Sequence, residues 1–224
     1  MSSAASPAAP ASPRVRLAFA LLISLGVALR LPALRVERLG DDWYHVSMAE
    51  GTYPVRRAPW DLYAFVRDTP EEYRAFQARG TFPWWVTPEL KLAPWRPLAS
   101  VLLWLDVRVL GRGAVASHAL SLAVWAALLI AASRWLRAVL PWGAALVAVA
   151  ALALDESATV PIAWIANRAS LLATAFGLFG AACLVAQRAK TSPRAQRVTA
   201  LWFALAALSG EYGLAVAASA VAFE

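Results

Sequence analysis

The chain has 224 residues, of which 60% are apolar, and its formal net charge is +7. A typical soluble domain is about 45–50% apolar, whereas here the apolar residues form long blocks, so the composition indicates a multi-pass integral membrane protein. Nearly all of the basic charge is arginine, and it clusters at the ends of the apolar blocks. That is the pattern of membrane orientation and argues against nucleic acid as a partner.

Residues 1–14 are small, polar and rich in proline, and we interpret them as a disordered cytoplasmic tail. The block at 15–34 predicts a first transmembrane helix. A cleavable signal peptide is the alternative, but no small-x-small cleavage site follows and Arg30 closes the apolar run. The only cysteine, Cys183, lies inside a later apolar block, so we interpret it as a small core residue without an intrachain disulfide.

One later block differs from the others because it contains the charged residues Arg96, Asp106 and Arg108. Its apolar residues recur at the spacing of one helix face, which predicts a helix over 95–111. A charged side chain at the centre of a span costs about 2.5–3.5 kcal/mol on insertion scales. A helix lying in the membrane interface avoids that cost, and we expect this orientation for 95–111.

With that helix set aside, the remaining apolar blocks predict five transmembrane helices, at 15–34, 114–135, 138–154, 168–187 and 198–223. The last of these contains glycines and can break near residue 210. Residues 35–113 then form a long external loop rich in tryptophan and tyrosine. This topology places the N-terminus and the arginine clusters in the cytoplasm. The sequence therefore predicts an all-α, polytopic membrane protein.

Two pairs of acidic residues fall on the external side in this topology. Asp41 and Asp42 follow the first span, Asp155 and Glu156 follow the third, and Arg168 begins the next one. Such groups at one depth can bind a divalent cation such as Mg²⁺ or Mn²⁺, deprotonate an acceptor, or hold a phosphate. Solvated helix ends are the alternative interpretation, and the residues alone leave the two balanced.

Three further ionisable residues are candidates for a functional or a packing role. Glu211 lies in the last apolar block, where an ionisable group usually faces a cavity or a partner, unless a break at Gly210 leaves it at an interface. His45 follows the acidic pair and is a candidate for the same site, whereas His118 is more consistent with a packing histidine. No phosphate-binding glycine loop, serine–histidine elbow or Cys/His cluster is present, which leaves carboxylate chemistry at the membrane surface.

The order of four short motifs resembles a known family. "GDDWYH" follows the first span, "WRPLASVLLWLDVRVL" comes next, and "VPIAWIANRAS" and "SGEYG" follow later. This order resembles the GT-C superfamily of polytopic glycosyltransferases, in the branch of the protein O-mannosyltransferases and the transmembrane and tetratricopeptide-containing mannosyltransferases. The resemblance spans 15–224 and implies the N-terminal, truncated part of a GT-C-like module. The chain departs from the family at Gly210, where relatives often have lysine.

The resemblance implies an enzyme that moves a mannose-like sugar from a polyprenyl-phosphate donor to a protein or glycan acceptor. Its site would face the extracytoplasmic side of a membrane, here a bacterial inner membrane, in contact with membrane lipid. The implied catalytic residues are Asp41 and Asp42. The candidate residues for binding the donor phosphate or substrate are Arg96, Arg168, Asp155, Glu156, His45 and Glu211. The alternatives are a non-catalytic subunit of polysaccharide assembly and a transporter that uses Glu211.

Overall fold

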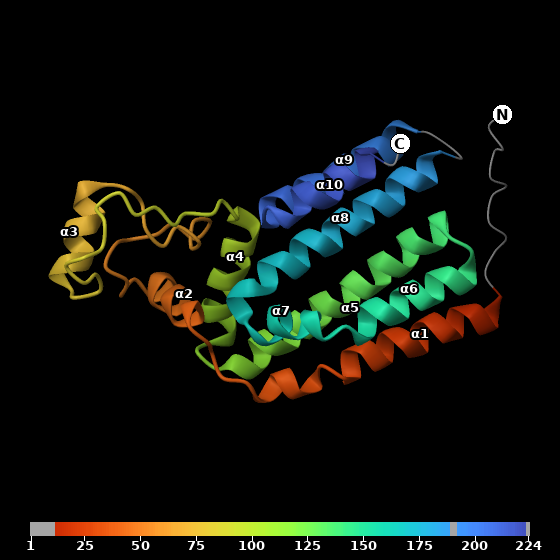
Figure 1. Cartoon of the computed structure of the whole chain (residues 1–224), viewed down its shortest axis with the longest axis horizontal. Coiled ribbons are helices and arrows are strands. Elements are labelled where there is room, and N and C mark those ends of the chain that lie inside the picture. The colour runs from red at the N-terminus through yellow and green to blue at the C-terminus, as the bar shows by residue number, and fades with distance from the viewer. Residues whose placement is uncertain (1–11, 189–191, 223–224) are drawn as a thin grey trace.

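The computed structural model describes residues 12–188 and 192–222. Regular secondary structure in these residues is helical, apart from a single antiparallel bridge between Val66 and Leu92, so the predicted all-α class is confirmed. Figure 1 shows the long helices side by side, with α2, α3 and α4 gathered at one end. The main helices are α1 (Pro13–Ala28), α2 (Asp41–Glu50), α3 (Pro70–Ala78), α4 (Pro97–Leu105), α5 (Ala114–Val139), α6 (Trp142–Leu154), α7 (Thr159–Ala163), α8 (Arg168–Gln187), α9 (Pro193–Ser209) and α10 (Tyr212–Ala222).

Among the described residues, three helical segments are long and apolar enough to cross a membrane: Pro13–Arg35, Ala114–Val139 and Ile165–Gln187. Helix α6 has 13 residues, so it is about 20 Å long and shorter than a bilayer core of about 30 Å. It counts as a fourth span only together with Glu156–Ala163, to which it is joined at a bend of 51°. The five spans that the sequence predicts are therefore not confirmed.

The predicted span at 198–223 is replaced by the two helices α9 and α10. Helix α9 ends at Ser209, and a Cβ atom added to Gly213 would lie 2.4 Å from the backbone of Ala206. In a continuous helix these two residues would be about 10 Å apart. The chain therefore turns back at Gly210 and Glu211. The expected break near residue 210 is confirmed, and the idea of one continuous helix is wrong because glycine at 213 allows the returning chain to approach α9 closely.

The helix predicted over 95–111 forms as α4, which continues into a π-helical turn at Asp106–Leu110. Figure 1 shows α4 running across the ends of the long helices and not alongside them. This orientation is the one expected of a helix that lies in the interface while its neighbours span the membrane.

The long loop after α1 is a folded unit with an apolar core. Tyr53, Leu62, Val66 and Phe76 are buried in one cluster that extends to residues of α4 and α8. Arg57 and Glu72 form an ion pair at 2.6 Å whose side chains are 2% and 13% exposed, which fastens α3 to the preceding loop. Residues 51–96 thus form a platform at one end of the bundle, which we call the loop end.

The opposite end of the bundle, which we call the basic end, is where α1 begins, α5 ends, α8 ends and α9 begins (Figure 1). No aspartate or glutamate of the described residues lies in these four helix termini. The arginines there are Arg14, Arg16, Arg134, Arg137, Arg188, Arg194 and Arg197. The orientation in which this basic end faces the cytoplasm stays a prediction from the positive-inside rule.

This orientation can be tested by cysteine labelling in a Cys183→Ser background. We expect Glu71→Cys, in exposed α3, to react with a membrane-impermeant maleimide applied from outside. We expect Arg194→Cys to react only after the membrane is permeabilised, because arginine-rich segments are retained in the cytoplasm. Labelling of Arg194→Cys in intact cells would contradict the orientation.

Candidate functional site

The acidic pair forms the first turn of α2, directly after the first candidate span. The chain leaves α1 through a short 3₁₀ helix at Leu31–Arg35 and reaches Gly40, whose φ of 46° suits glycine and few other residues. Helix α2 begins at the next residue, so Asp41 and Asp42 occupy the end of the helix whose dipole favours negative charge.

The two aspartates have different surroundings. Asp42 is 1% exposed, and its carboxylate accepts hydrogen bonds from the backbone N–H groups of Leu39 at 2.9 Å and Ala166 at 2.6 Å. Burial raises the pKa of Asp42, opposed by these N–H groups and by the charge of Arg38. Asp41 is partly exposed, and its carboxylate makes no hydrogen bond or ion pair with the described residues. Of the predicted catalytic pair, only Asp41 is therefore available to a substrate.

Arg38 is a buried residue of this region that sequence reasoning missed. Its guanidinium donates to the backbone carbonyls of Gly111, Arg112 and Gly113 and to the hydroxyl of Ser117. It therefore ties the segment before the acidic pair to the beginning of α5. In the sequence Arg38 is an isolated arginine three residues before the aspartates, and no local pattern predicts its contacts with residues 111–117.

Arg168, expected to hold a donor phosphate, is instead part of a buried ion pair. Its guanidinium contacts the carboxylate of Asp106 at 2.5 Å, and the two side chains are 2% and 3% exposed. A second nitrogen donates to the hydroxyl of Ser121 at 3.1 Å. The pair joins the end of α4 to α5 and α8. In this structure the charge of Arg168 is balanced by Asp106 and shielded from solvent, and its phosphate-binding role stays a prediction.

His45 is also buried, with 1% of its surface exposed. Its ring packs edge-on against Tyr63 and Phe65, with centroids 4.8 and 5.1 Å away. Burial lowers the pKa of His45 to about 3, so the ring is neutral at physiological pH. In this structure His45 therefore packs in the interior, and its contact with a substrate stays a prediction. His118 is fully buried with Nδ1 3.3 Å from the carbonyl of Ile162, in agreement with a packing histidine.

Arg96 and Glu211 meet across the loop end. Arg96 precedes α4, Glu211 lies in the turn between α9 and α10, and the guanidinium binds both carboxylate oxygens, one of them at 3.0 Å. The guanidinium also lies 4.9 Å above the ring of Tyr63. Hydrogen bonding by Arg96 lowers the pKa of Glu211. Glu211 therefore lies in a break between two helices, which is the alternative that the sequence left open, and Arg96 is its partner there. Its role in binding a substrate stays a prediction.

We expect Glu211→Gln to lower the melting temperature by about 2–4 °C, because a good bidentate pair near the surface contributes up to about 1 kcal/mol. A thermal-shift measurement on purified protein in detergent tests this. The control is Glu156→Gln, which removes an exposed carboxylate with no partner among the described residues. Equal melting temperatures for the two variants would show that the pair does not hold the α9–α10 turn.

The second acidic pair stays apart from the first. Asp155 and Glu156 are exposed at the end of α6, where the carboxylate of Asp155 accepts the N–H of Ser157 at 2.9 Å and its backbone carbonyl accepts from Arg30 at 2.5 Å. Within residues 12–188 and 192–222, no group of three or more His, Cys, Asp or Glu side chains could hold a metal ion. A Mg²⁺ or Mn²⁺ ion bound by all four carboxylates, which the sequence left as one possibility, does not fit this arrangement, because the Asp42 carboxylate is turned inward onto backbone N–H groups.

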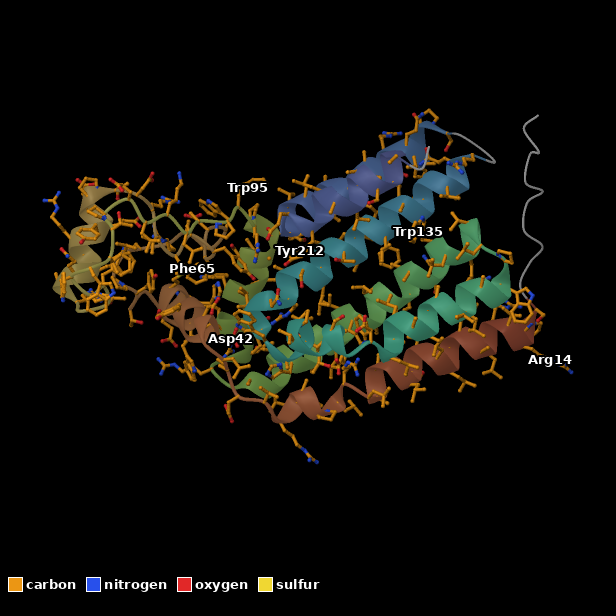
Figure 2. All side chains as sticks on the ribbon, viewed as in Figure 1. Arg14, Asp42, Phe65, Trp95, Trp135 and Tyr212 are labelled. Atoms are coloured by element: carbon orange, nitrogen blue, oxygen red, sulfur yellow. The ribbon has the colours of Figure 1, made fainter. Side chains whose placement is uncertain are left out.

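The residues of the loop end nevertheless come together from distant parts of the chain. Figure 2 shows Asp42, Phe65, Trp95 and Tyr212 at the same end of the bundle, contributed by α2, the loop, the approach to α4 and α10.

An all-helical chain with three or four helices able to cross a membrane among its described residues is consistent with an integral membrane protein. Comparisons with protein-family models, curated proteins and solved structures find no match to this chain.

Proposed function

We propose that this protein is a membrane glycosyltransferase that moves a mannose-like sugar from a polyprenyl-phosphate donor to a protein or glycan acceptor on the extracytoplasmic side. The observation that carries the proposal is Asp41, a partly exposed carboxylate without a partner among the described residues. It lies six residues beyond the end of the first candidate span at Arg35. At this distance from the span, we expect the carboxylate to lie at the depth where the head group of a lipid-phosphate donor meets water.

In the proposed reaction, Asp41 accepts the proton of the acceptor hydroxyl, for which it must lie within about 2.6–3.2 Å or one water molecule of that group. The acceptor oxygen forms a bond to the anomeric carbon while the bond from that carbon to the phosphate oxygen breaks. The lipid phosphate leaves with the electron pair, and the configuration inverts. Arg96 can stabilise the leaving phosphate after its ion pair with Glu211 opens.

A specific observation favours a second candidate, a non-catalytic membrane subunit of polysaccharide assembly. Both arginines expected to bind phosphate are paired with carboxylates, Arg96 with Glu211 and Arg168 with Asp106. Proteoliposomes containing the protein, a membrane acceptor and labelled polyprenyl-phosphate mannose distinguish the two. Sugar transfer that depends on Asp41 supports the enzyme, and its absence from folded, correctly oriented protein supports the subunit.

A further inference from the structure

We propose that the groove between α8 and α9 at the basic end binds the head group of one anionic phospholipid. Figure 1 shows these two helices lying side by side, and the Phe179 ring of α8 stacks on the Trp202 ring of α9 with centroids 5.0 Å apart. The groove is at the opposite end of the bundle from Asp41, so this inference is independent of the proposed enzymatic function.

The groove contains a pocket of about 360 Å³. It is lined by Cys183, Ala186, Gln187, Ser192, Arg194, Ala195 and Val198. The volume falls within the range of about 300–1,000 Å³ that is usual for small-molecule sites. Apolar side chains form much of the wall, while Ser192 and Arg194 bring polar groups to the beginning of α9. This combination suits a molecule with an apolar chain and a polar head.

Two arginines, Arg194 in the pocket wall and Arg134 on the adjacent α5, have no acidic partner among the described residues. Arg194 is exposed and makes no hydrogen bond or ion pair there. Arg134 of α5 places its guanidinium 5.9 Å from the ring of Phe179, which is one helical turn from Cys183 in the pocket wall. Both arginines can therefore reach an anion seated at the polar mouth.

The backbone adds to this positive field. Ser192 caps the first turn of α9 by accepting the N–H of Ala195 at 3.2 Å, and the 17-residue helix directs the positive end of its dipole toward the pocket mouth. No described aspartate or glutamate lies in the four helix termini of the basic end. Carboxylates of these helix termini therefore do not balance the positive charge of the basic end.

A phospholipid fits the groove better than a soluble anion does. Helix α8 belongs to a segment that is long and apolar enough to cross a membrane, so we expect the pocket at the end of this segment to lie at the membrane surface. A phosphate bound at Arg134 and Arg194 can then keep its acyl chains in lipid. Basic pockets between transmembrane helices are known to take anionic head groups in this way.

The test uses the full chain purified in detergent and titrated with phosphatidylglycerol or phosphatidylcholine, with bound lipids counted by native mass spectrometry. We expect one phosphatidylglycerol to bind with preference over phosphatidylcholine. The double variant Arg134→Gln with Arg194→Gln should weaken that binding about tenfold or more, since each basic residue contributes to attraction of an anionic lipid. The matched control, Arg14→Gln with Arg16→Gln, removes the same charge from the basic end but outside the groove, and it should retain binding.

A second variant keeps the proposal testable if the double variant does not fold. Val198→Trp fills the pocket without changing the charge, and it should also reduce phosphatidylglycerol binding. Equal loss in the groove variant and in the Arg14/Arg16 control would show a general attraction to the basic end and overturn the site. Unchanged binding in Val198→Trp, or equal binding of the two lipids to the unmodified protein, would overturn it as well.

Discussion

Replacing Asp41 with asparagine is expected to lower sugar transfer by about 10²–10⁴-fold, the usual loss when a general base is removed. The asparagine amide cannot accept the acceptor proton but preserves the size of the side chain. Because the Asp41 carboxylate makes no hydrogen bond or ion pair with the described residues, the melting temperature should stay the same. Initial rates of transfer from labelled polyprenyl-phosphate mannose in proteoliposomes, measured with thermal unfolding of the same preparation, check both parts.

Asp42→Asn is the matched control because it makes the same chemical change one residue further along. The two carboxylate oxygens of Asp42 accept hydrogen bonds from the N–H groups of Leu39 and Ala166. In asparagine one of these oxygens is replaced by an NH₂ group, which cannot accept, so one of the two backbone N–H groups loses its acceptor. An unsatisfied buried group costs about 1–3 kcal/mol, so this variant should lose stability. Full transfer by Asp41→Asn, at intact stability, would mean that Asp41 is not the base and would favour the non-catalytic subunit.

Asp106→Leu is expected to destabilise the protein by about 3–5 kcal/mol, because it leaves the Arg168 guanidinium charged and buried without its partner. Such a loss should appear as reduced yield of folded protein and a melting temperature lower by roughly 10 °C or more. Detergent thermal-shift measurements and size-exclusion profiles provide the readout. The effect should be much larger than that of Glu211→Gln, since the Glu211 carboxylate is more than half exposed.

The double variant Asp106→Leu with Arg168→Met separates the charge effect from loss of packing. Removing both partners of a buried pair is often neutral or stabilising when apolar side chains of similar size take their place. We therefore expect the double variant to recover much of the lost stability. Glu50→Gln is the control, since its partner Arg112 is 69% exposed and the pair should contribute less than about 1 kcal/mol. A double variant less stable than Asp106→Leu alone would contradict this account.

The sequence located some residues of the candidate site only approximately. The aspartate pair was predicted at the end of the first span, whereas both residues lie in the first turn of α2, after a 3₁₀ helix that follows α1. For Glu211 the sequence left open a cavity, a partner or a helix break, and the structure shows a break at which Arg96 is the partner. The burial of Asp42, His45 and Arg168 could not be predicted, because it depends on contacts with residues far away in the chain.

The sequence by itself determined the all-α class, the apolar helices able to cross a membrane, and the arginine clusters without neighbouring acidic residues that form the basic end. These properties follow from composition and periodicity, which act over one or two helical turns. Tertiary structure alone decided that α9 and α10 form a hairpin and that Asp106 pairs with Arg168. It also decided that one aspartate of the pair is exposed and the other buried. The physical reason is that a charged side chain in an apolar environment is stable only where a partner is supplied, and the partner comes from another helix.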